Sequence, residues 1–336
     1  MNSSQKLPES LDNVTILVAG GAGFIPSTLS EFYLKMGAKV IGIDNFITGS
    51  RSNLEKLFKY PKYEFHEMDI IQGLPNLSNE KIDYIFSLAS PASPIDFKII
   101  PLEIMRVNSE GTLKLLDLAK EKGARFLEAS TSEVYGDPLV HPQVETYLGN
   151  VNCIGPRSSY DESKRFAESM TMVFNRFKGV DTRIIRIFNT YGPGMRPDDG
   201  RVIPNFINQA LENKDITIYG DGSQTRSFCY VTDLVRAIHH VMFCGDSTPY
   251  NCGNPDEYTI KECAEEIIKV LGSKSQLTYR PLPIDDPKKR RPNISKLNSL
   301  SGFKPEVSFS EGIKKTALFF KSLKKERVAP EELSVW

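Results

Sequence analysis

A glycine-rich turn between an apolar strand and a helix is the feature that most restricts the fold of this chain. Residues Val14–Ala19 (VTILVA) form an unbroken apolar run, which is typical of a strand buried on both faces of a parallel sheet. Gly20, Gly21 and Gly23 follow, and a helical pattern begins at Phe24. Glycines at such a turn let the backbone approach a pyrophosphate at a helix N-terminus, where free N–H groups favour anions. The sequence therefore predicts a dinucleotide site at this turn.

An acidic residue after the second predicted strand completes the pattern. Strand Lys39–Ile43 ends at Asp44, which lies 21 residues after Gly23. A carboxylate there hydrogen-bonds ribose hydroxyls and repels a 2′-phosphate, so NAD is favoured over NADP. One position departs from the fingerprint, because Pro26 stands where a third glycine is expected. Proline is tolerated in a first helical turn, where its missing N–H would be unbonded, but a donor toward the pyrophosphate is lost.

Strand and helix patterns alternate up to about Thr190. Further strands are predicted at Tyr63–Glu67, Asp83–Leu88, Arg125–Ala129 and Thr182–Phe188, and helices at Leu102–Lys120 and Ser158–Phe177. This alternation with short connections predicts an α/β fold, a Rossmann-type doubly wound parallel sheet. After Thr190 clusters of Gly, Pro and Asp interrupt the rhythm. We therefore expect a smaller, mixed α/β substrate-binding domain at the carboxyl edge of the sheet, where open α/β sheets bind ligands.

The later part of the chain supplies this second domain. Predicted strands and helices are Ile216–Tyr219, Ser227–Val231, Asp233–Phe243, Thr259–Leu271 and Ser310–Lys321. We assign residues 1–188 and 228–252 to the NAD-binding domain and residues 189–227 and 253–325 to the nucleotide-sugar-binding domain. Ser322–Trp336 has charge but little periodicity, and residues 326–336 are assigned to a tail.

Charge and cysteine content exclude several classes of function. The 42 Lys+Arg balance 42 Asp+Glu, whereas nucleic acid and anionic membranes call for a basic surplus. No apolar run approaches the roughly 18 residues of a membrane span, and Met1–Asn13 lacks the apolar segment of a signal peptide. The five cysteines contain no CxxC pair and no histidine at metal-ligand spacing, so we expect reduced thiols and no metal site. The protein is expected to be soluble and cytoplasmic.

A tyrosine and a lysine four residues apart form the candidate catalytic pair. Tyr160 and Lys164 (YDESK) begin a predicted helix, and this spacing places both side chains on one face. A nearby ammonium and an oxidised nicotinamide would lower the tyrosine pKa, and a shift of about 3 units corresponds to roughly 4 kcal/mol. The pair alone also fits a solvated lysine beside a packing tyrosine. Together with the glycine turn and with Ser130–Glu133 upstream, it is typical of the short-chain dehydrogenase/reductase site.

Further stretches carry a closer resemblance to one enzyme family. They are Leu88–Pro94 (LASPASP), Ala129–Pro138 (ASTSEVYGDP), His141–Lys164 with its GNVNCIGPRSSYDESK, Arg186–Pro193 (RIFNTYGP), Asp199–Phe206 (DGRVIPNF), Tyr219–Val231 (YGDGSQTRSFCYV) and Asp285–Ile294 (DDPKKRRPNI). From about Val14 to Phe320 the chain resembles the UDP-glucuronic acid decarboxylases (UDP-xylose synthases), which are extended short-chain dehydrogenases/reductases. The last three stretches lie in the expected substrate region and are more specific than the glycine turn.

The resemblance implies the roles of individual residues. Thr131 and Tyr160 would hydrogen-bond the hydroxyl on sugar carbon 4, and Lys164 would hold the nicotinamide ribose and tune Tyr160. Glu133 would lie beside sugar carbon 5, and Arg290 would pair with the substrate carboxylate through a guanidinium fork. The residues assigned to catalysis are Thr131, Ser132, Glu133, Tyr160, Lys164 and Arg290. Those assigned to NAD are Gly20, Gly23, Phe24, Ile25, Asp44, Asn45, Asp69, Ile70, Leu88, Ala89, Tyr160 and Lys164. Those assigned to the UDP-sugar are Pro91, Asn189, Arg201, Val202, Tyr219, Gln224, Arg226 and Arg290, with Asn189 and Arg226 on the diphosphate.

The implied reaction is the decarboxylation of UDP-glucuronate to UDP-xylose by transient oxidation at sugar carbon 4 with tightly bound NAD. The resemblance also implies a homodimer through the helices at Leu102–Lys120 and Ser158–Phe177. Two alternatives stay open. A dTDP-glucose 4,6-dehydratase-like enzyme shares the oxidation but uses an aspartic acid between the Thr and the Glu, where this chain has Ser132, a poorer proton donor. A non-catalytic sugar-nucleotide-binding protein is supported only by Pro26.

Overall fold

The computed structural model describes residues 7–281 and 289–325, and its largest element is a seven-stranded sheet. Its strands are β1 (Thr15–Ala19), β2 (Lys39–Asp44), β3 (Tyr63–Glu67), β4 (Tyr84–Ser87), β5 (Arg125–Thr131), β6 (Thr182–Ile187) and β11 (Pro249–Cys252). They lie in the order β3-β2-β1-β4-β5-β6-β11, and every neighbouring pair is parallel. The order reverses between β1 and β4, and such a switch point forms a ligand-binding crevice at the carboxyl ends of the strands. The predicted doubly wound fold is confirmed.

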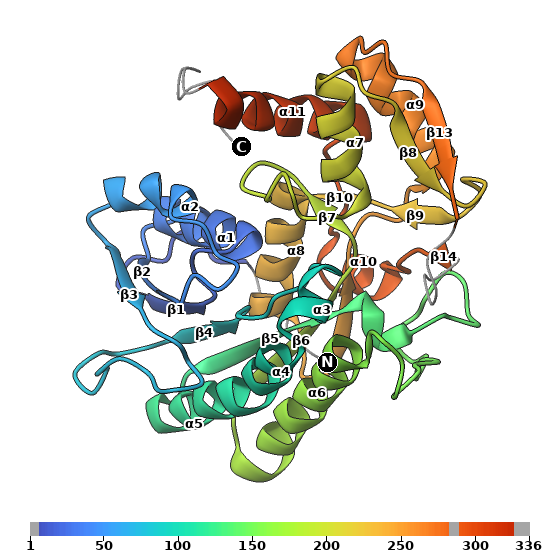
Figure 1. Cartoon of the computed structure of the whole chain (residues 1–336). Helices are drawn as coiled ribbons and strands as arrows, with labels where there is room; N and C mark the ends of the chain where they lie inside the picture. Colours follow the sequence, from blue (N-terminus) through green and yellow to red (C-terminus); the bar gives the residue numbers. More distant parts are fainter. Residues whose placement is uncertain (1–6, 282–288, 326–336) are drawn as a thin grey trace.

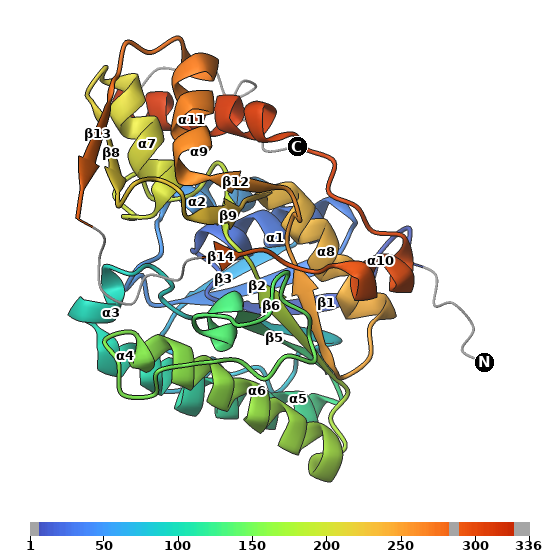
Figure 2. The same cartoon turned by 90° about the vertical axis from the view of Figure 1, so that its right-hand side faces the viewer.

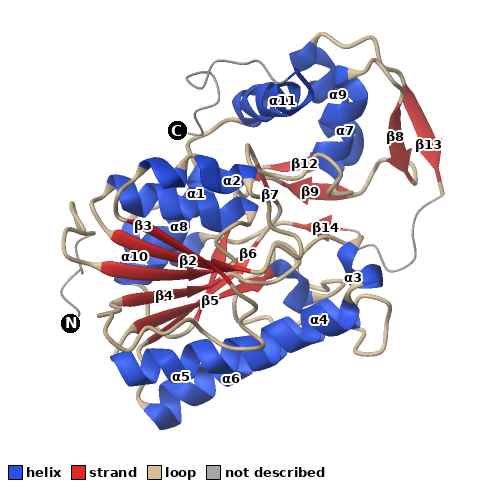
Figure 3. Cartoon of the chain, turned by 60° about the vertical axis from the view of Figure 1, so that its left-hand side comes forward, coloured by secondary structure: helices blue, strands red, loops and turns tan. Residues whose placement is uncertain are grey.

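Helices cover both faces of the sheet. The longer ones are α1 (Phe24–Lys35) and α8 (Val231–Cys244) on one face, and α5 (Thr112–Lys122) and α6 (Ser158–Lys178) on the other. Figure 3 shows the strands as a red layer between these two groups of helices. The side chains of β1 alternate between the two faces of the sheet. Ile16 and Val18 belong to the apolar core under α1 and α8, whereas Leu17 and Ala19 belong to the apolar core under α5 and α6. This two-sided burial explains the unbroken apolar run of the first strand.

A second group of elements gathers beyond the carboxyl ends of the strands, and its helices lie at the top of Figures 1 and 2. They have a separate apolar core built on three helices, α7 (Val202–Leu211), α9 (Ile260–Leu271) and α11 (Phe309–Lys325). The small sheets are β8 (Ile216–Tyr219) with β13 (Leu277–Arg280), β7 (Thr190–Tyr191) with β10 (Cys229–Tyr230), and β9 (Thr225–Ser227) between β12 (Glu257–Thr259) and β14 (Lys289–Arg290). The remaining short elements are α2 (Ser52–Glu55), η1 (Leu57–Lys59), α3 (Asp96–Ile99), α4 (Pro101–Arg106), η2 (Val107–Gly111), η3 (Ser132–Tyr135) and α10 (Ser295–Ser301).

The predicted helix Leu102–Lys120 is not continuous. It consists of α4, the π-helical turn η2 and α5. Gly111 in this turn packs closely on Ile70, because a Cβ at Gly111 would lie 2.8 Å from Ile70 Cδ1. A π-turn adds a residue to the helix at such a site, and periodicity alone does not reveal it.

Three other sequence-based predictions are corrected. Helix α7 was not among the predicted elements, and its Pro204 lies in the first helical turn, where proline is tolerated. The single strand predicted at Ser227–Val231 is divided between β9 and β10, which belong to different sheets. Helix α11 continues through Lys325, so the expected tail begins later than Ser322. The rest of the tail (326–336) and positions 285–288 of the Asp285–Ile294 stretch lie outside the described residues.

Within the described parts of the chain, no helix has the length and apolar character needed to cross a membrane.

Candidate active site

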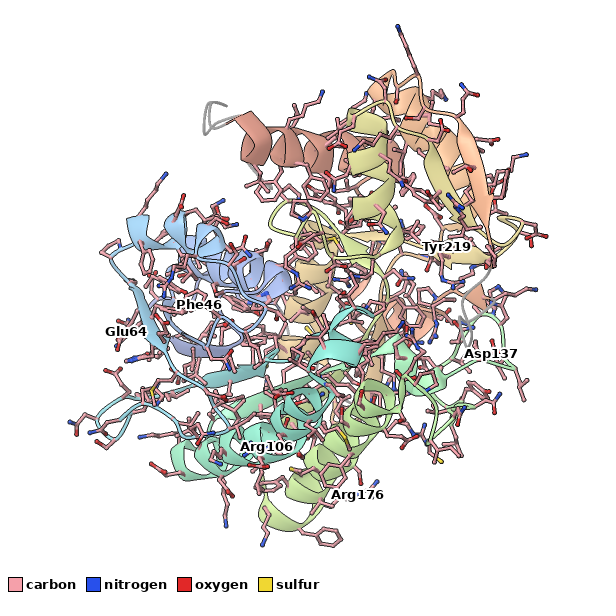
Figure 4. The ribbon with its side chains drawn as sticks, viewed as in Figure 1. Phe46, Glu64, Arg106, Asp137, Arg176 and Tyr219 are labelled. Atoms are coloured by element: carbon pink, nitrogen blue, oxygen red, sulfur yellow. The ribbon has the colours of Figure 1, made fainter. Side chains whose placement is uncertain are left out.

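A cavity of about 1370 Å³ lies at the carboxyl ends of the sheet strands and extends to β9 and β14. Every residue assigned from the sequence to catalysis, NAD or the UDP-sugar lines this cavity. Pockets for one drug-sized ligand are about 300–1,000 Å³, so the volume suits a dinucleotide together with a second ligand. Figure 4 shows Phe46 and Tyr219 far apart. Phe46 comes two residues after Asp44, the acid expected to bind the cofactor ribose, and Tyr219 lies at the end of β8.

The glycine turn forms a cradle that side chains would fill. Gly20 has φ +84°, and a Cβ there would lie 2.8 Å from the carbonyl oxygen of Leu88. Gly23 is the N-cap of α1 and has no side chain to cover the free N–H groups of the first helical turn. A helix N-terminus with bare backbone at the end of β1 suits an anionic diphosphate. The cradle therefore fits a dinucleotide.

Asp44 closes the cradle on the side of β2. Its Oδ2 accepts the N–H of Ala22 at 3.0 Å, and its Oδ1 accepts the N–H of Phe46 at 2.7 Å. Burial raises the pKa of this carboxyl, and the backbone donors act in the opposite direction. A carboxylate has about four lone-pair sites, so Asp44 keeps acceptor capacity for ribose hydroxyls.

Pro26 is accommodated without breaking α1. The first intrahelical bond runs from the N–H of Ser27 to the carbonyl oxygen of Gly23 at 3.1 Å, so an N–H at position 26 would have no helical acceptor. The proline is buried, and its Cγ would lie 3.1 Å from a Cβ at Gly23. Its ring thus occupies space at the cradle and removes one of the donors that a helix N-terminus offers to an anion.

Replacing Pro26 by glycine should leave NAD affinity equal or up to about tenfold tighter, because a backbone donor to a charged group is restored. Isothermal titration of NAD into both proteins measures the change. A clear loss of affinity would show instead that the loop is adapted to proline.

Tyr160 and Lys164 lie on the sheet-facing side of α6, beside the end of β5. The Tyr160 ring stacks on Phe97, with centroids 4.7 Å apart and planes 16° apart. Burial raises the pKa of Tyr160 well above its ordinary value, while a hydrogen bond with Thr131 acts to lower it. Lys164 Nζ donates to the carbonyl oxygen of Ala129 at 2.7 Å and to Glu128 Oε1 at 3.2 Å. Burial therefore outweighs the hydrogen bond with Thr131 in the chain alone, and the Lys164 ammonium, which was expected to lower the Tyr160 pKa, is paired with Glu128.

Two arginines flank Glu133. Arg157 Nη2 donates to Glu133 Oε2 at 2.7 Å, and Arg290 Nη2 donates to the same oxygen at 3.2 Å. Burial would raise the pKa of Glu133, but the guanidinium groups of Arg290 and Arg157 outweigh it and hold the pKa at about 2. Glu133 is therefore an anion at neutral pH, so it accepts protons and hydrogen bonds rather than donating them.

Arg290 is more enclosed than the sequence suggests. Its side chain is nearly fully buried, although it belongs to a basic run that would ordinarily be solvated. Besides Glu133, its guanidinium donates to the carbonyl oxygen of Ser132 and, at 3.0 Å, to that of Gly136. Arg290 thus supports the loop that carries Ser132 and Glu133, as well as lining the cavity.

The expected UDP-sugar residues lie along the far side of the cavity. Arg201 is the N-cap of α7 and pairs with Asp199 through two hydrogen bonds, one of them 2.8 Å long. Gln224 donates to the carbonyl oxygen of Tyr219 at 3.1 Å. The Pro91–Pro94 turn and the loop after β7 are tied together, because the Ser93 hydroxyl donates to the carbonyl oxygen of Asp199 at 2.5 Å. The two loops therefore form one wall.

Arg157 and Phe97 line the cavity and were not predicted. Arg157 precedes Tyr160 by three residues, a helical spacing within the stretch already singled out. That spacing was the available signal for the arginine. Phe97 gave no signal, because its stacking on Tyr160 depends on how α3 packs against α6.

Comparison with known proteins agrees with this geometry. The model of the "NAD dependent epimerase/dehydratase family" matches residues 16–253. The chain belongs to this family. It is 48% identical over 307 residues to UDP-glucuronic acid decarboxylase 1 of Arabidopsis thaliana, covering 91% of the chain and 70% of that protein. It is 46% identical over 309 residues to UDP-glucuronic acid decarboxylase 1 of Danio rerio, covering 92% and 73%. The family resemblance inferred from the sequence motifs is thereby confirmed.

A solved structure of the family has the same fold over its whole length. It is the UDP-glucuronic acid 4-epimerase from Bacillus cereus in complex with UDP-glucuronic acid and NAD. It superimposes with a TM-score of 0.83 at 29% identity, covering 92% of this chain and all of that one (100%).

Proposed function

We propose that this member of the family decarboxylates UDP-glucuronate to UDP-xylose with bound NAD. The observation that carries the proposal is the convergence of two guanidinium groups, from Arg157 and Arg290, beside Tyr160 in a cavity that also holds a dinucleotide cradle. A sugar carboxylate entering there would meet two guanidinium groups that share one acid, Glu133, next to the catalytic tyrosine. The two decarboxylase relatives, at 46–48% identity, support the same substrate.

The chain's own residues would act on the sugar in a defined order. When bound, NAD supplies reversible hydride acceptance at sugar carbon 4. Tyr160 removes the proton of the carbon-4 hydroxyl, and the resulting ketone is β to the carboxylate, so loss of CO₂ leaves an enolate. Thr131 and Tyr160 stabilise the oxyanion by hydrogen bonding. Carbon 5 would take up a proton from water, and Tyr160 would return its proton to the carbon-4 oxygen when that carbon is reduced again, so there is no net redox change.

Ser132 separates this reaction from dehydration. A 4,6-dehydratase must protonate a leaving hydroxyl, and a serine at that position is a far poorer acid than a carboxyl group. Glu133 does not replace the acid, because the neighbouring arginines keep its pKa at about 2. We therefore propose decarboxylation rather than loss of water.

Incubation with UDP-glucuronate tests the proposal directly. We expect CO₂ release and a UDP-pentose identified as UDP-xylose by mass spectrometry and NMR. Binding without turnover would indicate a non-catalytic protein, and a dehydrated product from dTDP-glucose would indicate the dehydratase.

We also propose that residues 1–188 and 228–252 form the NAD-binding domain and that residues 189–227 and 253–325 form the UDP-sugar-binding domain.

We also propose a homodimer formed through α4, α5 and α6. Arg106 and Arg176, labelled in Figure 4, mark this layer of helices. Large apolar side chains are exposed on it, including Leu102 (67% exposed), Phe166 (53%) and Phe177 (75%). Apolar residues gathered on one outer layer are typical of a subunit interface.

The free cysteines described in the structure support our proposal of a reducing, cytoplasmic setting.

Replacing Phe166 by glutamate should dissociate this dimer, since a charge would be buried in the interface and weaken association by about 2 kcal/mol or more. Sedimentation velocity reports the change in mass. Phe58→Glu is the matched control, because Phe58 is equally exposed (61%) but lies beside β3. A monomeric wild type, or an unchanged dimer in Phe166→Glu, contradicts the proposed interface.

A further inference from the structure

The lysine of the catalytic pair has an acidic partner that the proposed mechanism does not use. Glu128 lies on β5 with no exposed surface, and its Oε1 accepts a hydrogen bond from Lys164 Nζ at 3.2 Å. The other oxygen, Oε2, is buried without a hydrogen-bond partner among the described residues. Burying a carboxylate is costly unless an opposite charge compensates it. Lys164 is the cation that does so here.

The alternation of β5 explains this contact. Glu128 and Ser130 point to the face of the sheet that α6 covers, where Lys164 and Glu168 lie one helical turn apart. Lys164 binds Glu128, and Glu168 accepts a hydrogen bond from Ser130. The ordinary occupant of a central parallel strand is apolar. A glutamate at this position, aimed at the catalytic pair, therefore points to a function.

We propose that Glu128 is a positioning residue that holds Lys164 and neutralises its charge, so that the site accepts the positively charged, oxidised nicotinamide. The proposal rests on the proposed function only in taking Lys164 as the residue that holds the nicotinamide ribose. With two protons directed to Glu128 and to the Ala129 carbonyl, the ammonium keeps a third N–H for a ribose hydroxyl. Without Glu128, two positive charges would face each other in a buried site, where like charges repel strongly.

The other charges near this pair have partners of their own. These ion pairs are Glu168 with Arg186, Asp199 with Arg201, and Glu133 with Arg157 and Arg290. On the neighbouring strand β4, Ser87 lies directly beside Glu128 in the strand register. Burial raises the pKa of Glu128, while Lys164 and then Ser87 act to lower it.

Asp161, next to Tyr160, determines which measurement is informative. Burial and Glu133 raise its pKa to about 7. Because a second buried carboxyl with a raised pKa lies beside the catalytic tyrosine, a pH–rate profile does not isolate the effect of Glu128. The redox preference of the bound cofactor does, since it depends on charge near the nicotinamide.

The test equilibrates the holoenzyme with equal concentrations of NAD⁺ and NADH and then measures both in the extracted protein. Glu128→Gln keeps the size of the side chain but removes its charge. In this variant the ratio of bound NADH to bound NAD⁺ should rise about tenfold, which is the factor that corresponds to a pKa shift of one unit by a nearby charge. Glu128→Leu, a second neutral variant, should shift the ratio in the same direction. Glu128→Asp keeps the charge and should stay near wild type. Glu162→Gln is the control, because it removes a half-buried carboxylate two residues from Lys164 on the same helix, where it pairs with Arg165 instead.

Two results would overturn the proposal. An unchanged ratio in both neutral variants would show that the charge of Glu128 does not act on the cofactor. A lower total of bound cofactor at the same ratio would make Glu128 a structural residue only. No UDP-glucuronate enters the measurement, so a chain that failed to decarboxylate would contradict the proposed function and leave this inference to be decided separately.

Discussion

Replacing Tyr160 by phenylalanine should lower the rate of CO₂ release from UDP-glucuronate by about 10²–10⁴-fold, the range expected for a lost acid–base group. The phenolic hydroxyl is the only group removed, and the ring keeps its stacking on Phe97. Fold and NAD content should therefore stay close to wild type. Circular dichroism and extraction of bound cofactor measure these two properties.

Tyr33→Phe is the control for this substitution. Tyr33 is fully buried on α1, and its hydroxyl has no hydrogen-bond partner among the described residues. The same chemical change there should leave turnover within about twofold, because surface and core hydroxyls away from the cavity take no part in proton transfer. Activity of Tyr160→Phe within tenfold of wild type would remove Tyr160 from the mechanism.

Replacing Arg290 by alanine should nearly abolish activity on UDP-glucuronate. A desolvated anion left without its partner costs on the order of 3–5 kcal/mol, and two anions, the substrate carboxylate and Glu133, depend on this guanidinium. UDP and UDP-glucose carry no carboxylate, so their affinities should change little. Arg290→Lys should rescue poorly, because a point charge cannot donate to Glu133 and to the Gly136 carbonyl with the geometry of the fork.

Calorimetric titration of UDP, UDP-glucose and UDP-glucuronate into both variants checks this prediction. Arg291→Ala is the neighbouring control, since that side chain is 39% exposed and donates to the carbonyl oxygen of Pro255. If Arg290→Ala weakened the binding of all three ligands equally, Arg290 would contact the diphosphate or would only support the loop that carries Ser132 and Glu133. The preference for decarboxylation would then lose its main support.

Local patterns were sufficient to predict the fold class and the kind of cofactor. The turn at Gly20 and the acid at Asp44 are joined by one helix and one strand, so their spacing along the chain determines where they meet. Tyr160 and Lys164 face the same way because they lie one turn apart on α6. Helix α7 was not predicted. It begins shortly after the cluster of Gly, Pro and Asp that interrupts the pattern, and its Pro204 lies in the first turn, where proline is tolerated.

The sequence by itself determined a doubly wound sheet, a dinucleotide turn and a tyrosine–lysine pair, because all three depend on interactions between neighbours along the chain. Only the tertiary structure decided the electrostatics of the site. Glu128 and Lys164 are 36 positions apart, and Glu133 and Arg290 are 157 positions apart. They meet because α6 packs over β5 and β14 pairs with β9, and no periodicity of the chain records those contacts. The charge of a buried group depends on such distant partners, so the ionised Glu133 and the paired Lys164 follow from packing alone.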